Sequence, residues 1–234
     1  MIPYEKKIPN TPMPVDTKNN CFTDEPMVDL AEWFSNKIYI ETVYHNIGIA
    51  GSTKRCFVRK SVAKKLETAI TMLPDNLTFK VLDGWRPLAV QKELYEKHFE
   101  LIQKHNPTWD IARIKKEVAK YVSKPNPDIE NPAVHSTGGA IDVTLVHKDT
   151  AHEINMGTAF DDFSPMSYTA AFENEKDNDV RRNRRLLYWT MINAGFTNLP
   201  SEWWHYDYGD SFWSYYKNQP AIYCGIQKGE DING

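Results

Sequence analysis

The strongest structural signal in the chain is the segment Ala133-Val134-His135-Ser136-Thr137-Gly138-Gly139-Ala140-Ile141-Asp142-Val143-Thr144-Leu145. From residue 140 onward apolar positions alternate with small or polar ones, which predicts a β-strand with one face in the core. Asp142 lies on the opposite face, and His135 precedes the strand across a glycine turn. The segment therefore predicts a strand that presents a carboxylate close to an imidazole.

A second segment, Glu202-Trp203-Trp204-His205-Tyr206, supplies another imidazole and a carboxylate three residues before it. Two histidines and an aspartate make a three-ligand set that leaves zinc an open position, so His135, Asp142 and His205 are candidate zinc ligands. Glu202 is then the candidate general base. Because residues three apart on a strand point to opposite faces, the chain is expected to bend before His205 and to become extended only there.

Two other interpretations of this set stay open from the residue types alone. The first is a buried polar network without metal, which requires every buried polar atom to be hydrogen-bonded. The second is the iron site of non-haem oxygenases, which also uses two histidines and one carboxylate. Such sites commonly begin His-x-Asp, whereas six residues separate His135 from Asp142. The additional Glu202 is a hydrolase feature, and zinc is the preferred interpretation.

Arg86 stands between Trp85 and Pro87, where a strand is expected to end and a helix to begin. Hydrolysis of a carbonyl requires a positive partner for the oxyanion that forms in the transition state. Arg86 is the best candidate for that partner. The alternative, a surface salt bridge, stays open at this point.

The composition limits the class of protein. With 234 residues, 41% of them hydrophobic and 25% charged, the chain is long enough for one large globular domain. A net charge of −3 and a single short basic run argue against nucleic acid as a partner. No apolar run reaches the roughly 18–20 residues of a membrane span. The three cysteines are too few and scattered for a disulfide framework, so we expect a cytoplasmic protein, or a periplasmic one if the sequence is a mature form.

The order of elements predicts an α+β fold with a mostly antiparallel central sheet flanked by helices, because strands and helices mix without a regular βαβ rhythm. Residues 1–36 are polar and contain five prolines, so we expect an irregular arm that packs on a single domain formed by residues 37–234. Strands are expected over residues 37–44, 78–82 and from 140 onward, and helices over residues 61–72, 88–105, 108–122 and 180–194.

Taken together, the motifs resemble the D-alanyl-D-alanine dipeptidases of the vancomycin-resistance type, within the zinc DD-peptidases related to the hedgehog fold. The family motif Ser-x-His-x-x-Gly-x-Ala-x-Asp is matched here through residues 135–142. Four further segments match in the family's order, namely Asp83-Gly84-Trp85-Arg86-Pro87, Met156-Gly157-Thr158-Ala159-Phe160-Asp161, Asn183-Arg184-Arg185-Leu186-Leu187 and Glu202-Trp203-Trp204-His205-Tyr206.

The resemblance implies a hedgehog/DD-peptidase-like fold, one zinc ion per chain and hydrolysis of the D-alanyl-D-alanine dipeptide from cell-wall metabolism. It assigns the zinc ligands and the general base to the residues named above, and it gives Arg86 the role of polarising the scissile carbonyl. It adds Asp161 as the partner of the dipeptide's ammonium group. The family serine two residues before the first histidine is Ala133 here, which bears on substrate affinity.

Two alternatives to this function are a zinc D,D- or L,D-carboxypeptidase that cuts longer peptidoglycan peptides, and a non-catalytic zinc-binding module. Asp161 favours the dipeptidase, because an extended peptide has no free amine at that point. Glu202 and Arg86 argue against the non-catalytic module, since a structural zinc site requires neither.

Overall fold

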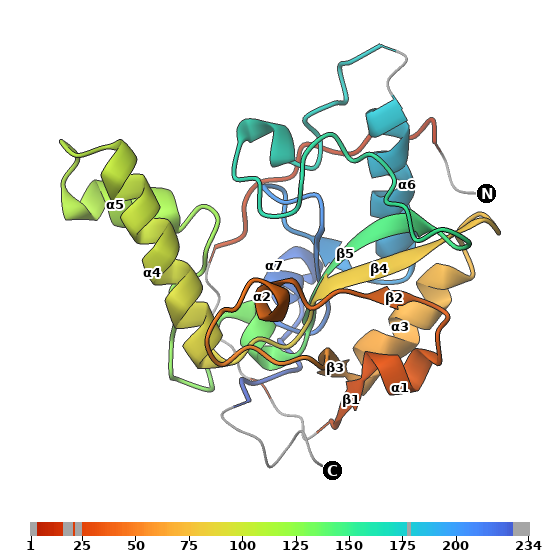
Figure 1. The fold of residues 1–234 in the computed structure, drawn as a ribbon, viewed down its shortest axis with the longest axis horizontal. Coiled ribbons are helices and arrows are strands. Elements are labelled where there is room, and N and C mark those ends of the chain that lie inside the picture. The colour runs from red at the N-terminus through yellow and green to blue at the C-terminus, as the bar shows by residue number, and fades with distance from the viewer. Residues whose placement is uncertain (1–3, 16–20, 22–24, 177–178, 227–234) are drawn as a thin grey trace.

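The computed structural model describes residues 4–15, 21, 25–176 and 179–226, and it has a five-stranded sheet at its centre (Figure 1). In spatial order the strands are β2 (Tyr39–Ile40), β4 (Leu77–Asp83), β5 (Ala140–His147), β7 (His205–Asp207) and β6 (Thr197–Asn198). Only β2 and β4 pair in parallel, and the other pairs of this sheet are antiparallel. The expectation of an α+β fold with a mostly antiparallel sheet is confirmed.

The main core lies on one face of β5, as the alternation predicted. Ile141, Val143 and Leu145 are fully buried there, in one cluster with the apolar stripes of α3 (Lys60–Ile70) and α6 (Asp179–Asn193). Both helices form where apolar residues recur every three to four positions. The core therefore covers one face of the sheet, and the Asp142 side chain projects from the other face of β5.

Helices α4 (Leu88–His105) and α5 (Ile111–Val118) form a hairpin that projects to one side of the body (Figure 1). Helix α4 starts directly after Pro87, as expected. Helix α5 is shorter than the predicted 108–122, because it begins only after Asp110, whose side chain accepts a hydrogen bond from the main-chain N–H of Arg113 at 2.7 Å. Ile111, the first residue of the helix, is 58% exposed, whereas Ile114 and Val118 are buried.

Residues 27–34, within the expected arm, are more regular than predicted. Strand β1 (Met27–Asp29) pairs with β3 (Phe57–Arg59), and helix α1 (Leu30–Phe34) follows directly. The Asp29 carboxylate caps this helix by accepting from the N–H of Ala31 at 2.8 Å, and both ends of the helix are buried in the main core. The expectation of an irregular arm is therefore wrong over residues 27–34.

The described residues 4–15 do pack along the body. The main-chain oxygens of Tyr4 and Lys6 accept hydrogen bonds from Arg185 and Trp189, both at 2.9 Å. The N–H of Ile8 donates to the Glu173 carboxylate at 3.1 Å. The division into an arm and one domain of residues 37–234 stays a prediction.

The predicted strand over residues 37–44 is also only partly formed. It is limited to β2, and the chain then turns into the short helix α2 (Val43–Asn46). The remaining elements are η1 (Val134–Thr137), η2 (Pro165–Ser167) and α7 (Ser211–Lys217). Across the ranges described above, no helix is long and apolar enough to cross a membrane.

Cys21 and Cys224 form a disulfide, with their Cα atoms 5.2 Å apart, while Cys56 is free and buried. The chain was expected to lack a disulfide framework, and the described residues contain this single bond. The two cysteines are separated by 203 residues in sequence, yet the bond joins them directly. Distance along the chain therefore gave no measure of distance in space.

Candidate metal centre and active-site cleft

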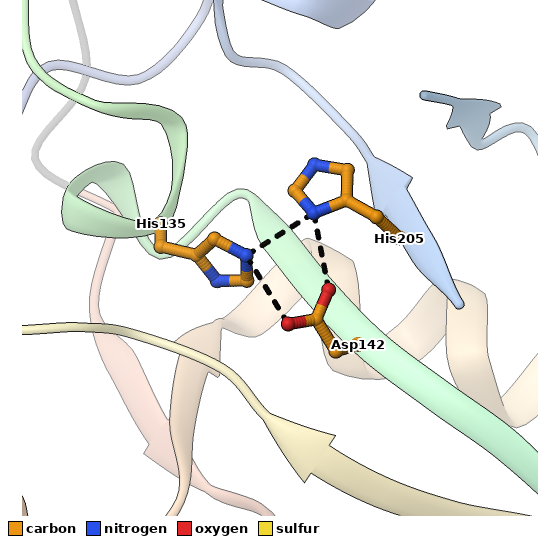
Figure 2. Close-up of side chains that lie close together, drawn as sticks. All are labelled: His135, Asp142 and His205. Atoms are coloured by element: carbon orange, nitrogen blue, oxygen red, sulfur yellow. Dashed lines mark hydrogen bonds and ion pairs between the residues drawn. The ribbon is translucent and has the colours of Figure 1, made fainter. Parts of the chain in front are cut away.

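His135, Asp142 and His205 point toward one another from three different elements (Figure 2). Each offers a ligand atom within 4.8 Å of the others, and all three residues are buried. The carboxylate of Asp142 lies 3.4 Å from Nε2 of His135 and 3.0 Å from Nδ1 of His205. The structure thus brings together the three residues that the sequence analysis selected as metal ligands.

The sheet register accounts for this convergence. Asp142 on β5 is the direct antiparallel partner of His205 on β7, so the two side chains leave the sheet on the same face. His135 arrives on the one-turn helix η1, which ends at Gly138 with a positive φ of 74°. L side chains rarely adopt this backbone conformation, and an added Cβ would also lie 2.6 Å from the terminal carbon of Met27, which would have to shift. Glycine is therefore required where the chain turns from His135 into β5.

Each histidine is oriented by a second hydrogen bond on its far nitrogen. Nδ1 of His135 donates to the carbonyl of Gly84 at 2.8 Å, and because a carbonyl only accepts, Nε2 is left without a proton to face Asp142. Nε2 of His205 donates to the carboxylate of Asp207 at 2.8 Å, so Nδ1 faces Asp142. Such outer partners are typical of histidines that hold a metal.

The donor set fits zinc. Two imidazole nitrogens and one carboxylate oxygen are ligands that zinc prefers, and three protein ligands are typical of its catalytic sites. Burial alone raises the pKa of Asp142, but the two imidazoles outweigh burial and hold that pKa well below its usual range. The carboxylate is therefore ionised and ready to bind a cation.

Glu202 reaches the same place because the chain bends before His205. The N–H of Glu202 donates to the carbonyl of Leu199, the N–H of His205 donates to the carbonyl of Glu202, and β7 starts only at His205. The predicted bend is confirmed. The carboxylate lies 3.9 Å from Nδ1 of His205, and burial raises the pKa of Glu202 to about 8.

Arg86 is buried, so the alternative of a surface salt bridge is wrong. Its guanidinium is held by Asp83 at 2.8 Å, by Oε1 of Gln91 at 2.9 Å and by the hydroxyl of Tyr44 at 3.3 Å. Burial alone lowers the pKa of Arg86, but the anionic groups around it outweigh burial and raise the pKa. A permanent positive charge therefore stands 3.7 Å from the Asp142 carboxylate.

Asp161 faces the same cavity from the long loop after β5. Its backbone is left-handed, with a φ of 57°, and its carboxylate accepts a hydrogen bond from the Tyr44 hydroxyl at 3.0 Å. Burial raises the pKa of Asp161 to about 7, against the opposing effect of Arg86. A buried carboxylate in this position is suited to pair with a ligand cation.

Three residues that hold this site together were not predicted from the sequence. Tyr44 bridges Arg86 and Asp161, Gln91 fixes Arg86 from helix α4, and Asp207 orients His205. Tyr44 was assigned to a strand, which hid its role. Asp207 could have been predicted from the sequence. It stands two residues after His205, where the chain was expected to be extended, so the two side chains lie on the same face of the strand.

A single cavity of about 220 Å³ collects the candidate groups. Its lining includes the three candidate ligands together with Arg86, Asp161 and Glu202. Ala133, which stands where the resembled family has serine, also lines it. The six polar residues that the sequence analysis selected therefore face one shared space.

Comparison with known proteins places the chain among peptidases. A family model described as D-ala-D-ala dipeptidase matches residues 36–223. A D-alanyl-D-alanine dipeptidase of Synechocystis sp. is 30% identical over 181 residues, covering 69% of this chain and 73% of the relative. A D-alanyl-D-alanine dipeptidase of Enterococcus faecium is 40% identical over 78 residues, covering 33% of this chain and 38% of the relative.

Among solved structures, a vancomycin-resistance D,D-pentapeptidase in complex with Zn(II) aligns with 72% of this chain and 84% of its own. Its sequence identity is 15% and its TM-score is 0.43.

Proposed function

The chain belongs to the D-ala-D-ala dipeptidase family, and from that premise we propose that it is a zinc-dependent hydrolase of D-alanyl-D-alanine. The observation that carries the proposal is the meeting of His135, Asp142 and His205, with ligand atoms within 4.8 Å, in a cavity that Glu202 and Arg86 also line. Each part of the proposed chemistry corresponds to one of these side chains.

His135, Asp142 and His205 would hold one zinc ion through Nε2, a carboxylate oxygen and Nδ1 respectively, the atoms that already face one another. Zinc with three protein ligands keeps an open position, where it acidifies a water molecule and polarises a carbonyl oxygen. The bonds to Gly84 and Asp207 fix both rings with these nitrogens facing inward.

Glu202 is the proposed general base. Its buried carboxylate accepts a proton from the attacking water and passes it to the amine that leaves. A pKa raised by burial suits a group that must both take up and release a proton near neutral pH. Its carboxylate lies 3.9 Å from a proposed ligand atom of His205, so it stands beside the position where that water would be.

Arg86 is the proposed partner of the oxyanion. Asp83, Gln91 and Tyr44 hold its guanidinium in place before any substrate arrives, so no reorganisation is required as negative charge develops. Asp161 is the proposed partner of the substrate's ammonium group, with its carboxylate held by Tyr44. The two residues would thus hold the scissile carbonyl and the free amine at a fixed separation.

Asp161 favours a dipeptide over the longer peptides of a carboxypeptidase. Continuing the chain past the amine would replace an ammonium with an uncharged amide and leave a buried carboxylate without a cation, which costs free energy. The non-catalytic module is disfavoured because Glu202 and Arg86 are buried beside the candidate metal site, where each costs desolvation.

The test is release of D-alanine from D-alanyl-D-alanine by purified, zinc-loaded protein. Glu202→Gln removes the base but no proposed ligand, so zinc should stay bound while kcat falls at least about 10²–10⁴-fold. Near wild-type kcat in this variant, with zinc bound, would contradict the proposed mechanism. Turnover by a variant that lacks two proposed ligands would contradict the metal assignment.

The Cys21–Cys224 disulfide bears on the compartment. Disulfides persist in oxidising environments and are rare where thiols are kept reduced. The bond therefore favours the periplasmic alternative over the cytoplasmic expectation. Alkylation of the denatured, unreduced protein taken directly from cells checks this, because one labelled cysteine indicates the disulfide and three indicate a reduced chain.

A further inference from the structure

The cavity continues well beyond the catalytic groups, along helix α4. Gln91, Leu94, His98 and Leu101 all line it, and their spacing of three to four residues places them in one stripe on the helix. From position 91 to position 101 the helix rises about 15 Å. Two extended peptide residues span only about 7 Å. A dipeptide bound at the proposed catalytic groups therefore leaves part of this cavity unfilled.

The outer part of the cavity is mainly apolar and aromatic. We call it the apolar lobe and define it by its lining residues Leu94, His98, Leu101, Tyr121, Val122 and Phe163. The ring centroid of Phe163 lies 4.5 Å from that of His98 and 5.3 Å from that of Tyr121, so the three rings form one wall. Burial lowers the pKa of His98, which keeps this ring uncharged at neutral pH.

The apolar lobe lies on the side of the cavity where the ammonium group would bind. Leu94 packs against the cluster that contains Tyr44, whose hydroxyl holds Asp161, and Leu94 and Phe163 pack against a second cluster. The lobe therefore adjoins the proposed ammonium partner, and the substituent best placed to enter it is on the residue that carries the ammonium. In a dipeptide this is the side chain of the amino-terminal residue.

An apolar side chain fits this lobe better than a continued peptide backbone does. Each further residue would bring an N–H and a C=O that must find partners when buried. Gln91 already uses both ends of its amide, since Oε1 accepts from Arg86 and Nε2 donates to the carbonyl of Ser123. Nε2 of His98 is buried without a hydrogen-bond partner among the described residues, but one ring nitrogen cannot pair with both the N–H and the C=O of a further residue. Burial of an apolar side chain, in contrast, contributes about 0.8 kcal/mol of binding free energy for each methylene group.

We propose that the apolar lobe is a specificity subsite for a bulky apolar side chain on the amino-terminal residue of a D,D-dipeptide. The substrate class is then wider than D-alanyl-D-alanine and includes dipeptides such as D-leucyl-D-alanine. The inference rests on the proposed function, because it takes Asp161 as the ammonium partner.

Calorimetry on the zinc-loaded Glu202→Gln variant tests the subsite without turnover. D-Leucyl-D-alanine is expected to bind with a Kd about tenfold or more below that of D-alanyl-D-leucine, which places the same side chain at the other end. Equal or reversed affinities would overturn the proposal. Tri-D-alanine binding as tightly as D-leucyl-D-alanine would also overturn it, because the lobe would then hold a continued chain.

A lobe-filling variant and a matched control give a second measurement. Leu94→Trp should raise the Kd ratio of D-leucyl-D-alanine to D-alanyl-D-alanine by about tenfold. Glu100→Trp, an exposed position on the same helix outside the lobe, should leave that ratio unchanged. If Leu94→Trp does not fold, Leu101→Trp at the more exposed end of the lobe repeats the test.

The subsite and the proposed function fail in different ways. If the wild-type protein releases no D-alanine, but D-leucyl-D-alanine still binds more tightly than D-alanyl-D-leucine, the proposed hydrolysis is wrong and the subsite stands. If D-alanyl-D-alanine is cleaved, but D-leucyl-D-alanine does not bind more tightly than D-alanyl-D-leucine, only the subsite is wrong.

Discussion

Replacing Asp207 by alanine is expected to weaken zinc binding about 10–100-fold. Asp207 is fully buried in β7, and its Oδ1 lies 2.8 Å from Nε2 of His205. Because the carboxylate accepts, the imidazole carries its proton on Nε2 and turns Nδ1 toward Asp142, 3.0 Å away. One hydrogen bond therefore sets both the tautomer and the orientation of a proposed ligand.

The hydrogen bond gives a physical reason for a loss of this size. The expected 10–100-fold change corresponds to roughly 1.4–2.8 kcal/mol at 1.4 kcal/mol for each tenfold. Alanine also leaves the Nε2–H of His205 buried without its acceptor, which costs about 1–3 kcal/mol. The ring must then either keep an unpaired donor or rotate away from Asp142, and both choices weaken the metal site.

Competition with a chromophoric chelator at fixed pH measures the affinity, and thermal unfolding of the metal-free protein shows that each variant folds. Asp207→Asn keeps an oxygen acceptor at the same position and should lose less affinity than Asp207→Ala. A folded Asp207→Ala protein with wild-type zinc affinity would refute the role of this hydrogen bond. It would also show that His205 is oriented by packing alone.

Three further substitutions address separate parts of the site. Arg86→Lys should lower kcat about 10²–10³-fold in steady-state assays with zinc content unchanged, because a single ammonium cannot replace the fixed fork of a guanidinium. Asp161→Asn should mainly raise KM, since the ammonium charge is present in both ground and transition states. In the wild type, KM should rise as the pH falls through about 7, because Asp161 gains a proton there and loses its charge. In Asp161→Asn this rise of KM at low pH should be absent from the pH profile. Arg184→Gln should destabilise the fold by about 3 kcal/mol in urea denaturation, because buried Arg184 donates to three main-chain carbonyls within residues 156–168.

The regular elements that periodicity predicted are those with a single apolar face. Strand β5 and helices α3 and α6 bury that face in one core, so the pattern in the sequence and the packing agree. Short elements whose position depends on distant partners were not predicted. Strand β1 exists only because it pairs with β3, and the Cys21–Cys224 bond joins segments 203 residues apart.

The ligand set could be named from the sequence, but its geometry could not. Residue types and motif order selected His135, Asp142 and His205, whereas the pairing of positions 142 and 205 is a property of the sheet register. A one-residue slip between β5 and β7 would have turned one of these side chains to the core face. Tyr44 and Gln91 lie outside the recognised motifs and were found only when α2 and α4 were seen against Arg86.

Helix α4 connects the proposed chemistry to the proposed selectivity. It begins two residues after Arg86 and holds that guanidinium through Gln91. About one turn after Gln91, Leu94 begins the apolar lobe. A shift of the helix that opened the lobe would also move Gln91, and with it the partner of the oxyanion. Substitutions near Gln91 are therefore expected to change both substrate choice and rate. Substitutions of Leu101, ten residues further along the helix, are expected to change substrate choice with the least effect on Arg86.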